Sequence, residues 1–382
     1  MLEIRDKKDC CGCGACVNVC PKSCITLVED IEGFMYPQVD ETACINCGLC
    51  EKICPINNVK NDSLITPETY GCFNKNNEEV LKSSSGGIFS LLAKYFYRNN
   101  GVVYGAAFVD AYNVAHVRTT NETELDKLRR SKYVQSETSG IFKSVQQDLQ
   151  KGLKVLFTGT NCQIAGLKAF LAKDYDNLYT QDIICHGVPS KKVWGKYLTE
   201  NKIGKDAEIN FREKSSGWER YNFCAKENGK TKIFEPFDKN SYMKAFLTDC
   251  SLRPSCYDCK FKSVDRYSDI TLADFWGAEK TYKDLYFKNG TSIVLIHSSK
   301  GKELFEKIKK EIECKKVDFM IVVSDNPSYL FSSKENKNRK MFFENIDKIK
   351  FKKLTKKYCE PTASQKLKRR VVRFIKKIKK KV

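Results

Sequence analysis

Cysteine is the residue type in this sequence with the most chemistry to offer. The 382 residues include 19 cysteines, and ten of them fall between Cys10 and Cys54. The run CCGCGACVNVCP, which starts at Cys10, recurs as CINCGLCEKICP from Cys44. Each copy spaces four cysteines as C-x2-C-x2-C-x3-C and ends in proline. Such thiolates bind soft metals or iron–sulfur clusters. The three histidines are too few for a metal centre built on imidazole.

The repeat resembles that of bacterial ferredoxins with two [4Fe–4S] clusters. In that pattern the fourth cysteine of each copy binds the other cluster. The resemblance therefore assigns one cluster to Cys10, Cys13, Cys16 and Cys54, and the second cluster to Cys44, Cys47, Cys50 and Cys20. A zinc ribbon is the alternative, but it requires paired C-x2-C knuckles. Cys11 and Cys24 lie outside the pattern, and we expect them to be ordinary small side chains.

The elements that follow must supply an electron donor or acceptor. After a polar linker at 57–69, the sequence predicts a helix with an apolar face from Ile88 to Phe96 and a second helix that carries Ile164, Leu167 and Leu171. It predicts strands at 101–109, 154–157, 178–185 and 269–275. Alternation of strand, turn and helix indicates a largely buried sheet. We expect an α+β protein: a ferredoxin module, then an α/β flavin-binding sheet domain, then a basic amphipathic C-terminal helix.

Six motifs occur in register along the chain, and together they resemble the coenzyme F420 hydrogenase/dehydrogenase β-subunit family over about residues 1–330. They are SSGGI at Ser84, SKYVQS at Ser131, GTNCQIAGL at Gly159, DIICHGVPS at Asp182, CYDCKFK at Cys256 and SDITLADFWG at Ser268. The predicted domains are 1–60 (two-cluster ferredoxin), 61–150 and 151–334 (N-terminal and C-terminal β-subunit regions) and 335–382 (basic tail).

The resemblance implies FAD beside the clusters. A flavin is the chemically sensible partner, because clusters exchange single electrons whereas hydride carriers exchange two. The predicted cofactor-binding residues are Ser85, Gly86, Gly87, Lys132, Tyr133, Thr158, Gly159, Thr160 and His186. From the residues alone, Ser83–Ser85 are interpreted as a helix N-cap and Lys132 as a solvated lysine. No catalytic residue is identified.

A second set of cysteines lies outside the ferredoxin repeats. Cys162 and Cys185 follow or end predicted strands, and Cys256 and Cys259 form a C-x2-C knuckle. Cysteines at strand ends converge on one edge of a sheet, so four thiolates can meet there. The resemblance favours a third [4Fe–4S] cluster at this set, with zinc and unligated thiols as alternatives. His186 then has three interpretations: it hydrogen-bonds a cluster sulfur, contacts the flavin, or orients its loop.

The positive charge is concentrated at the C-terminus. The net charge is +20, and residues 366–382 hold ten Lys or Arg and no acid. Leu367, Val371, Phe374, Ile375, Ile378 and Val382 fall at helical spacing among them. This pattern predicts a helix on an anionic membrane surface and argues against nucleic acid. A solvated helix is the alternative. No secretory signal or spanning segment is evident, so we expect a cytoplasmic protein, peripheral at the inner face of the membrane.

These observations predict an iron–sulfur flavoprotein oxidoreductase that exchanges electrons with an organic substrate or a deazaflavin-like carrier. Lysine outnumbers arginine 54 to 13, which suggests an AT-rich genome and argues against F420 itself. Relatives that occur with polysaccharide genes suggest a role in cell-surface polysaccharide biosynthesis. The alternative is an electron-transfer subunit that serves a separate catalytic partner. The sequence leaves the substrate, the direction of electron flow and the oligomeric state open.

Overall fold

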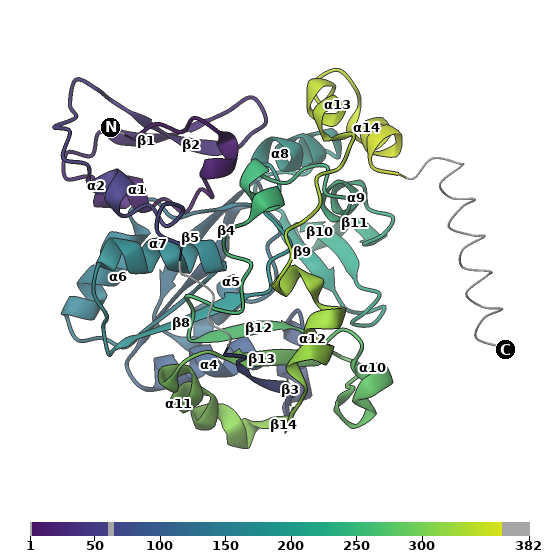
Figure 1. Ribbon diagram of the computed structural model, residues 1–382. Coiled ribbons are helices and arrows are strands. Elements are labelled where there is room, and N and C mark those ends of the chain that lie inside the picture. The colour runs from purple at the N-terminus through teal and green to yellow at the C-terminus, as the bar shows by residue number, and fades with distance from the viewer. Residues whose placement is uncertain (1, 60–64, 361–382) are drawn as a thin grey trace.

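The computed structural model describes residues 2–59 and 65–360. The N-terminal module shows the internal repeat as structure (Figure 1): each cysteine-rich run leads into a short helix, α1 (Ala15–Val19) or α2 (Leu49–Lys52), and a hairpin of β1 (Ile25–Glu29) and β2 (Met35–Val39) lies between them. Gly14 and Gly48 precede the two helices with φ of 77° and 71°. Glycine alone adopts this left-handed conformation without steric cost, which explains why both copies carry it. A 3₁₀ turn, η1 (Lys7–Asp9), precedes the first run.

The main domain is built on a nine-stranded sheet with the order β14-β3-β13-β12-β8-β7-β4-β5-β6. β4, β7, β8 and β12 run parallel, and antiparallel strands flank them on both sides. The strands are β3 (Glu68–Asn74), β4 (Val102–Asp110), β5 (Asn113–Thr119), β6 (Ser136–Glu137), β7 (Val155–Gly159), β8 (Leu178–Ile183), β12 (Ile270–Asp274), β13 (Ser292–Ile296) and β14 (Ile312–Lys316).

Helices cover both faces of this sheet, because successive strand residues point to opposite sides. Val103 packs with α4 (Ile88–Arg98) and α11 (Ser299–Ile308) on one face. Its neighbours Val102 and Tyr104 pack with α6 (Ile141–Gln150) and α7 (Asn161–Leu171) on the other face. The remaining short helices are α3 (Asn77–Lys82), α5 (Leu125–Leu128), α10 (Ala278–Thr281) and α12 (Phe319–Asp325), with 3₁₀ turns η2 (Glu122–Glu124), η3 (Pro254–Asp258), η4 (Lys283–Leu285), η5 (Lys309–Glu311) and η6 (Pro327–Tyr329).

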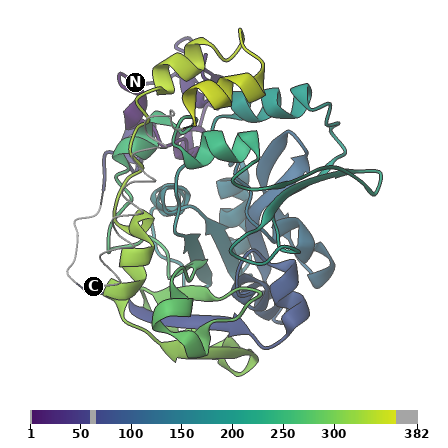
Figure 2. The same cartoon turned by 90° about the vertical axis from the view of Figure 1, so that its right-hand side faces the viewer.

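A separate core of aromatic residues forms a cap beside the sheet, which the sequence patterns did not predict. Trp194, Phe211 and Tyr242 are fully buried at its centre. Figure 2 shows its small three-stranded sheet projecting from the body. The cap consists of α8 (Lys191–Glu200), β9 (Glu208–Glu213), β10 (Asn222–Glu227), β11 (Lys230–Pro236), α9 (Ser241–Leu247), α13 (Arg339–Glu344) and α14 (Phe351–Tyr358).

The expected elements of the main domain are present. The predicted helices correspond to α4 and α7, and the predicted strands to β4, β7, β8 and β12. The predicted basic helix at 366–382 lies outside the described residues. Within the described part of the chain, no helix is long and apolar enough to cross a membrane.

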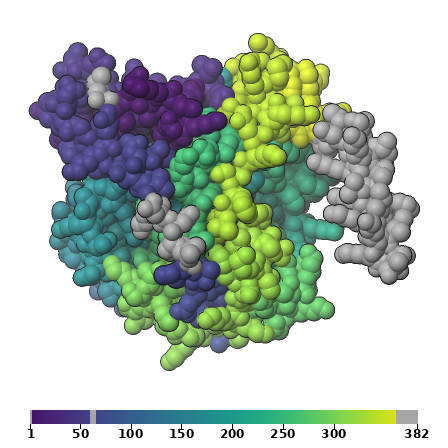
Figure 3. All heavy atoms as spheres, in the orientation of Figure 1, coloured from purple at the N-terminus to yellow at the C-terminus, as the bar shows by residue number. Residues whose placement is uncertain are grey.

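The ferredoxin module packs directly on the main domain, although the sequence suggested a polar linker between them. In Figure 3 its purple atoms sit against the teal and green atoms of the body. The Thr138 hydroxyl donates to the Cys13 carbonyl, 2.8 Å away, and the Asn18 amide donates to the Thr138 carbonyl at 3.1 Å. Arg339 holds Glu32 through two hydrogen bonds of 2.9 and 2.6 Å. The contacts extend along the module and fix its orientation relative to the sheet.

Candidate iron–sulfur and flavin sites

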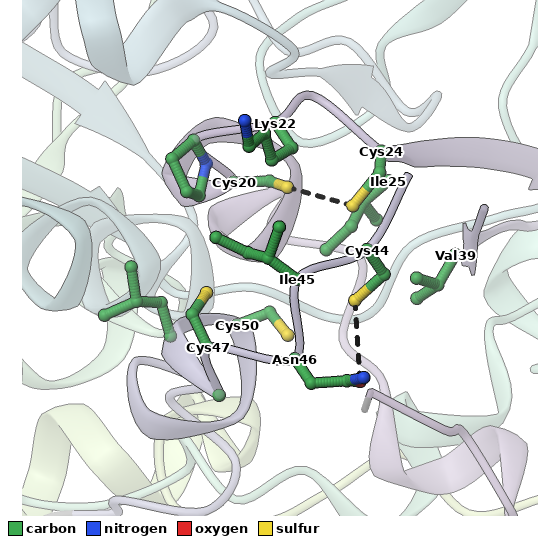
Figure 4. A pocket seen from close by; sticks show the side chains of 13 residues that line it. Cys20, Lys22, Cys24, Ile25, Val39, Cys44, Ile45, Asn46, Cys47 and Cys50 are labelled. Atoms are coloured by element: carbon green, nitrogen blue, oxygen red, sulfur yellow. Dashed lines mark hydrogen bonds between the residues drawn. The ribbon is translucent and has the colours of Figure 1, made fainter. Parts of the chain in front are cut away.

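The cysteines assigned to the second ferredoxin cluster line one pocket (Figure 4). Cys20 follows α1, whereas Cys44, Cys47 and Cys50 come from the loop and first turn of α2. The structure thus brings the fourth cysteine of the first repeat to the first three of the second. Cys24 lines the same pocket, with its Sγ 3.3 Å from that of Cys20. Cys24 is therefore a fifth thiol at this site, which the repeat pattern did not indicate.

The first set lies closer to the main domain. Burial raises the pKa of the Cys16 thiol to about 12, and the neighbouring thiols of Cys10 and Cys54 add to the rise. Cys13 packs against Gly166 of α7, where a Cβ built on the glycine would lie 2.9 Å from the Cys13 sulfur. A larger residue at 166 would displace the module, so this glycine is needed for close packing at the boundary.

The four cysteines of the main domain also meet in one pocket. Cys162 lies in the first turn of α7, Cys185 follows β8, and Cys256 and Cys259 lie in and after η3. Burial raises the pKa of Cys185 to about 11, with the thiols of Cys162 and Cys259 contributing to the rise. Burial likewise raises the pKa of Cys256, where Cys185, Cys259 and Cys162 add to it. The convergence predicted from the strand ends is therefore present in the fold.

Cys11 lines this pocket as well, so the expectation that it is merely a small side chain does not describe its position. Its thiol and that of Cys162 shift each other's pKa, and the Cys13 thiol raises the pKa of Cys11. Cys11 follows Cys10 in the chain and therefore lies between the first ferredoxin set and the pocket of the main domain. Chain spacing gave no sign of this contact, because Cys11 and Cys162 are far apart in sequence.

Basic side chains surround the same pocket. Lys262 and Arg266 line it together with His186. Burial lowers the pKa of Lys262, although the nearby Cys185 and Cys259 thiols oppose this shift. The Lys262 ammonium donates to the carbonyls of Cys185 and Ser328. Cations that line the pocket would offset the negative charge of thiolates bound to a metal cluster.

In the described part of the chain, no three His, Cys, Asp or Glu side chains lie close enough together to bind a single metal ion. Thiolates that bind a cubane each take a different iron, so they need not gather around one point as they do around zinc.

The predicted flavin residues lie along the carboxyl edge of the parallel strands. Thr158 and Gly159 end β7, and Thr160 caps α7 through a capping box with Gln163. Gly86 pairs with Asn74 at the end of β3 and with Ser292 at the start of β13. In open α/β sheets, ligands bind in the crevice outside this edge.

Lys132 and Tyr133 connect these segments. Ser131 donates to the Ser84 hydroxyl through its amide at 2.9 Å, which places Lys132 next to the serine–glycine turn. Burial lowers the pKa of Lys132 to about 7. Its ammonium donates to the Arg129 carbonyl at 2.6 Å, so the interpretation as a solvated lysine does not hold. The Tyr133 ring stacks on Phe246 with 4.9 Å between centroids.

The serine–glycine turn differs from the expected N-cap. Gly87, with φ of 81°, is the N-cap of α4, and no side chain caps this helix. Ser85 instead donates to the Thr291 carbonyl at 2.8 Å. A Cβ on Gly86 would lie 2.7 Å from the Cys72 carbonyl oxygen, so the strands occupy the space beside it. Flavin contact by Ser85, Gly86 and Gly87 stays a prediction.

His186 has a protein partner in addition to the pocket it lines. Its Nε2 lies 2.7 Å from Asp249 Oδ1, and its ring packs edge-on against Phe246. Since Phe246 also contacts Tyr133, this ring joins the cysteine pocket to the segment of Lys132 and Tyr133.

Sequence reasoning missed a buried ion pair on the same edge. Arg212 of β9 is paired with Asp274 at the end of β12, with Nη1 2.9 Å from Oδ2. Arg212 also lies over the ring of Tyr221 and contacts the Tyr133 hydroxyl at 3.5 Å. Its Nε is buried and has no hydrogen-bond partner among the described residues. Asp274 falls within a quoted motif, but nothing in the strand pattern marked Arg212.

Two family models match separate parts of the chain. Residues 152–320 match the family model for the C terminus of the beta subunit of coenzyme F420 hydrogenase/dehydrogenase, and residues 9–58 match the 4Fe–4S dicluster domain. A chain in a structure of the F420-reducing [NiFe] hydrogenase complex from Methanosarcina barkeri is 18% identical, with 75% of this chain and 95% of that chain covered and a TM-score of 0.48. The comparison with curated proteins gave no match.

The matched segments contain the cysteines of the three sets described above. Residues 9–58 hold both ferredoxin sets, and residues 152–320 hold Cys162, Cys185, Cys256 and Cys259. The protein is thus an iron–sulfur electron-transfer protein, and its relatives are oxidoreductases. By these two matches, residues 152–320 resemble the C-terminal region of the beta subunit of coenzyme F420 hydrogenase/dehydrogenase, and residues 9–58 form an N-terminal 4Fe–4S dicluster domain.

Proposed function

We propose that the protein is an iron–sulfur flavoprotein oxidoreductase. Electrons pass between the two ferredoxin clusters, a third [4Fe–4S] cluster on Cys162, Cys185, Cys256 and Cys259, and FAD at the carboxyl edge of the sheet. The observation that carries this proposal is the pocket shared by these four thiols and Cys11, because it lies between the ferredoxin module and the predicted flavin segments. Redox-silent zinc at this position would interrupt the route.

The donor set fits a cluster. Soft thiolates suit iron–sulfur chemistry, and Lys262 and Arg266 supply positive charge at the same pocket. The pocket walls also partly bury the thiols, which limits the access of oxygen and water to a cluster.

The carboxyl edge suits a flavin. FAD, when bound, would exchange one electron with a cluster and two with an organic partner. Lys132 would be able to take up or release a proton on Nζ near neutral pH, because burial lowers its pKa to about 7. Arg212 has a buried Nε without a partner beside Tyr133, which supports a polar ligand group there.

The proposed partner is a small organic substrate or a deazaflavin-like carrier, with a redox protein at the ferredoxin end. Cell-surface polysaccharide biosynthesis is the proposed setting, and the basic tail at 366–382 would hold the protein at an anionic membrane surface. If the purified chain turned over no small molecule alone but did so with a partner protein, it would be an electron-transfer subunit.

The test is the cofactor content of the full chain purified without oxygen. We expect about twelve iron atoms per chain, four for each cluster, and one FAD in the acid extract. Cys256→Ser should remove about four irons and leave the ferredoxin spectrum unchanged. Cys314→Ser is the matched control, since Cys314 is half-buried on β14 away from all three sets.

Two results would contradict the proposal. Zinc in place of the third set of irons would remove the proposed route, and a chain without flavin would remove the two-electron step. The ferredoxin assignment would stand in either case.

A further inference from the structure

Arg253 is a fully buried guanidinium at the boundary between the ferredoxin module and the main domain. It precedes η3, and its Nε donates to the Cys10 carbonyl at 2.7 Å. Its Nη2 donates to the Met35 carbonyl at 2.9 Å and lies 3.4 Å from Cys10 Sγ. The Tyr36 ring covers it, with 4.3 Å between the guanidinium carbon and the ring centroid.

The charge of Arg253 has no carboxylate partner among residues 2–59 and 65–360. Every other buried arginine described has one: Arg129 contacts Glu79, Arg212 contacts Asp274, Arg266 contacts Asp182 and Arg339 contacts Glu32. An isolated buried charge is costly unless an opposite charge lies nearby. The one group in direct contact with Arg253 that becomes anionic on metal binding is the Cys10 thiol.

The second ferredoxin set lacks such a cation within the same described ranges. Lys22 lines its pocket, but this side chain is exposed to solvent. Reduction adds one negative charge to a cluster, and a buried cation stabilises that charge far more than a solvated one does. The two clusters of the module therefore face unequal electrostatic environments.

We propose that Arg253 is the counter-ion of the cluster on Cys10, Cys13, Cys16 and Cys54, and that it holds the potential of this cluster above that of the cluster on Cys20, Cys44, Cys47 and Cys50. One electron then leaves the second cluster, which is oxidised, and reduces the first. The electron that refills the second cluster comes from a low-potential one-electron carrier protein. Electron flow is thus inward, toward the main domain, so the protein acts as a reductase of its organic partner.

The direction rests on the proposed function, whereas the role of Arg253 requires only the two ferredoxin clusters. The experiment is an anaerobic redox titration of the full chain, followed by electron paramagnetic resonance. In Arg253→Gln, the ratio of reduced to oxidised first cluster at a given potential should fall at least tenfold, which is about 59 mV for a one-electron couple. The second cluster should titrate as in the parent.

Arg253→Lys separates charge from shape. Its ammonium keeps the charge, so its first cluster should stay within about threefold of the parent ratio. Arg339→Gln is the matched control: Arg339 also joins the two modules while buried, yet its partner is Glu32 and no cluster cysteine. It should leave both potentials unchanged.

The proposal would be overturned if Arg253→Gln left the difference in reduction potential between the two clusters unchanged. It would also be overturned if Arg339→Gln shifted the potential of the first cluster by the same amount as Arg253→Gln. If Arg253→Gln fails to fold, Arg253→Lys still tests the proposal. A tenfold fall in its ratio of reduced to oxidised first cluster would overturn the proposal, because the positive charge would be present without stabilising the reduced cluster. Absence of the third set of irons would refute the proposed function but leave this titration interpretable.

Discussion

The thiols of Cys11 and Cys162 line the same pocket at the boundary between the ferredoxin module and the sheet domain, and each shifts the pKa of the other. One belongs to the first cysteine run and the other to the first turn of α7. This contact brings the edge of the first ferredoxin set to the pocket of the third. Five thiols line this pocket, whereas a [4Fe–4S] cluster needs four ligands, so one of the five is not a ligand.

Cys162, rather than Cys11, should be the fourth ligand of the third cluster. The thiols of Cys162, Cys185 and Cys259 all raise the pKa of Cys256, whereas Cys11 is not among the causes and follows Cys10 in the ferredoxin run. We expect Cys162→Ala to lose about four irons per chain and Cys11→Ala to lose none. Iron analysis of the two variants decides between them, and the reverse pattern would make Cys11 the ligand.

Cys24 should be able to replace Cys20 as a ligand of the second ferredoxin cluster. Because its sulfur lies 3.3 Å from that of Cys20 in the same pocket, Cys20→Ala leaves a thiol within reach. We expect the single variant to keep its iron with a changed resonance spectrum, and Cys20→Ala with Cys24→Ala to lose about four irons. Cys24→Ala alone should match the parent. Full loss of the cluster in Cys20→Ala alone would show that Cys24 cannot replace it.

The ion pair of Arg339 and Glu32 should stabilise the docking of the module. Both side chains are largely buried, with 9% and 16% exposed, so Glu32→Gln leaves a buried charge without its partner. We expect the free energy of unfolding to fall by about 2–3 kcal/mol, measured by urea denaturation of the anaerobic protein. Asp347→Asn breaks the exposed pair with Lys192 and should cost less than about 1 kcal/mol. Equal effects of the two changes would contradict the buried role.

Stability should fall as the pH drops below 6.5, because the buried His116 and the partly buried His297 are held neutral. Burial lowers the pKa of His116 to about 4 and that of His297 to about 3, from an ordinary value of 6.5. The unfolded chain binds these protons first, so the stabilisation is complete above pH 6.5 and is lost toward the folded values. Each histidine should contribute about 2 kcal/mol to the loss between pH 6.5 and 5. His116→Gln should therefore flatten the pH profile of urea denaturation, and an unaltered profile would refute this assignment.

Removal of residues 366–382 should abolish binding to anionic vesicles and leave the iron content unchanged. Ten cations lie in this segment, and each contributes about 1 kcal/mol near an anionic surface. Sedimentation with vesicles of anionic and of neutral lipid measures the effect. Equal binding by the shortened chain would show that the tail is not a membrane anchor.

The sequence by itself determined the local chemistry. The C-x2-C-x2-C-x3-C spacing indicates cluster ligands because three close thiolates wrap one face of a cubane, and Gly14 and Gly48 are recognisable because each run must turn tightly into a helix. The apolar stripe from Ile88 to Phe96 determined α4, and the short apolar runs determined β7 and β12. These are properties of neighbouring residues, so periodicity reveals them.

Only the tertiary structure decided what meets across long separations. Cys11 reaches Cys162, Arg253 reaches Cys10, and Arg212 reaches Asp274, although no spacing connects the members of these pairs. The buried aromatic core around Trp194 and Phe211 likewise escaped prediction, because its strands and helices are short and come from distant segments. Contacts of this kind depend on how whole elements pack. Packing is set by shape and burial summed over the fold rather than by local pattern.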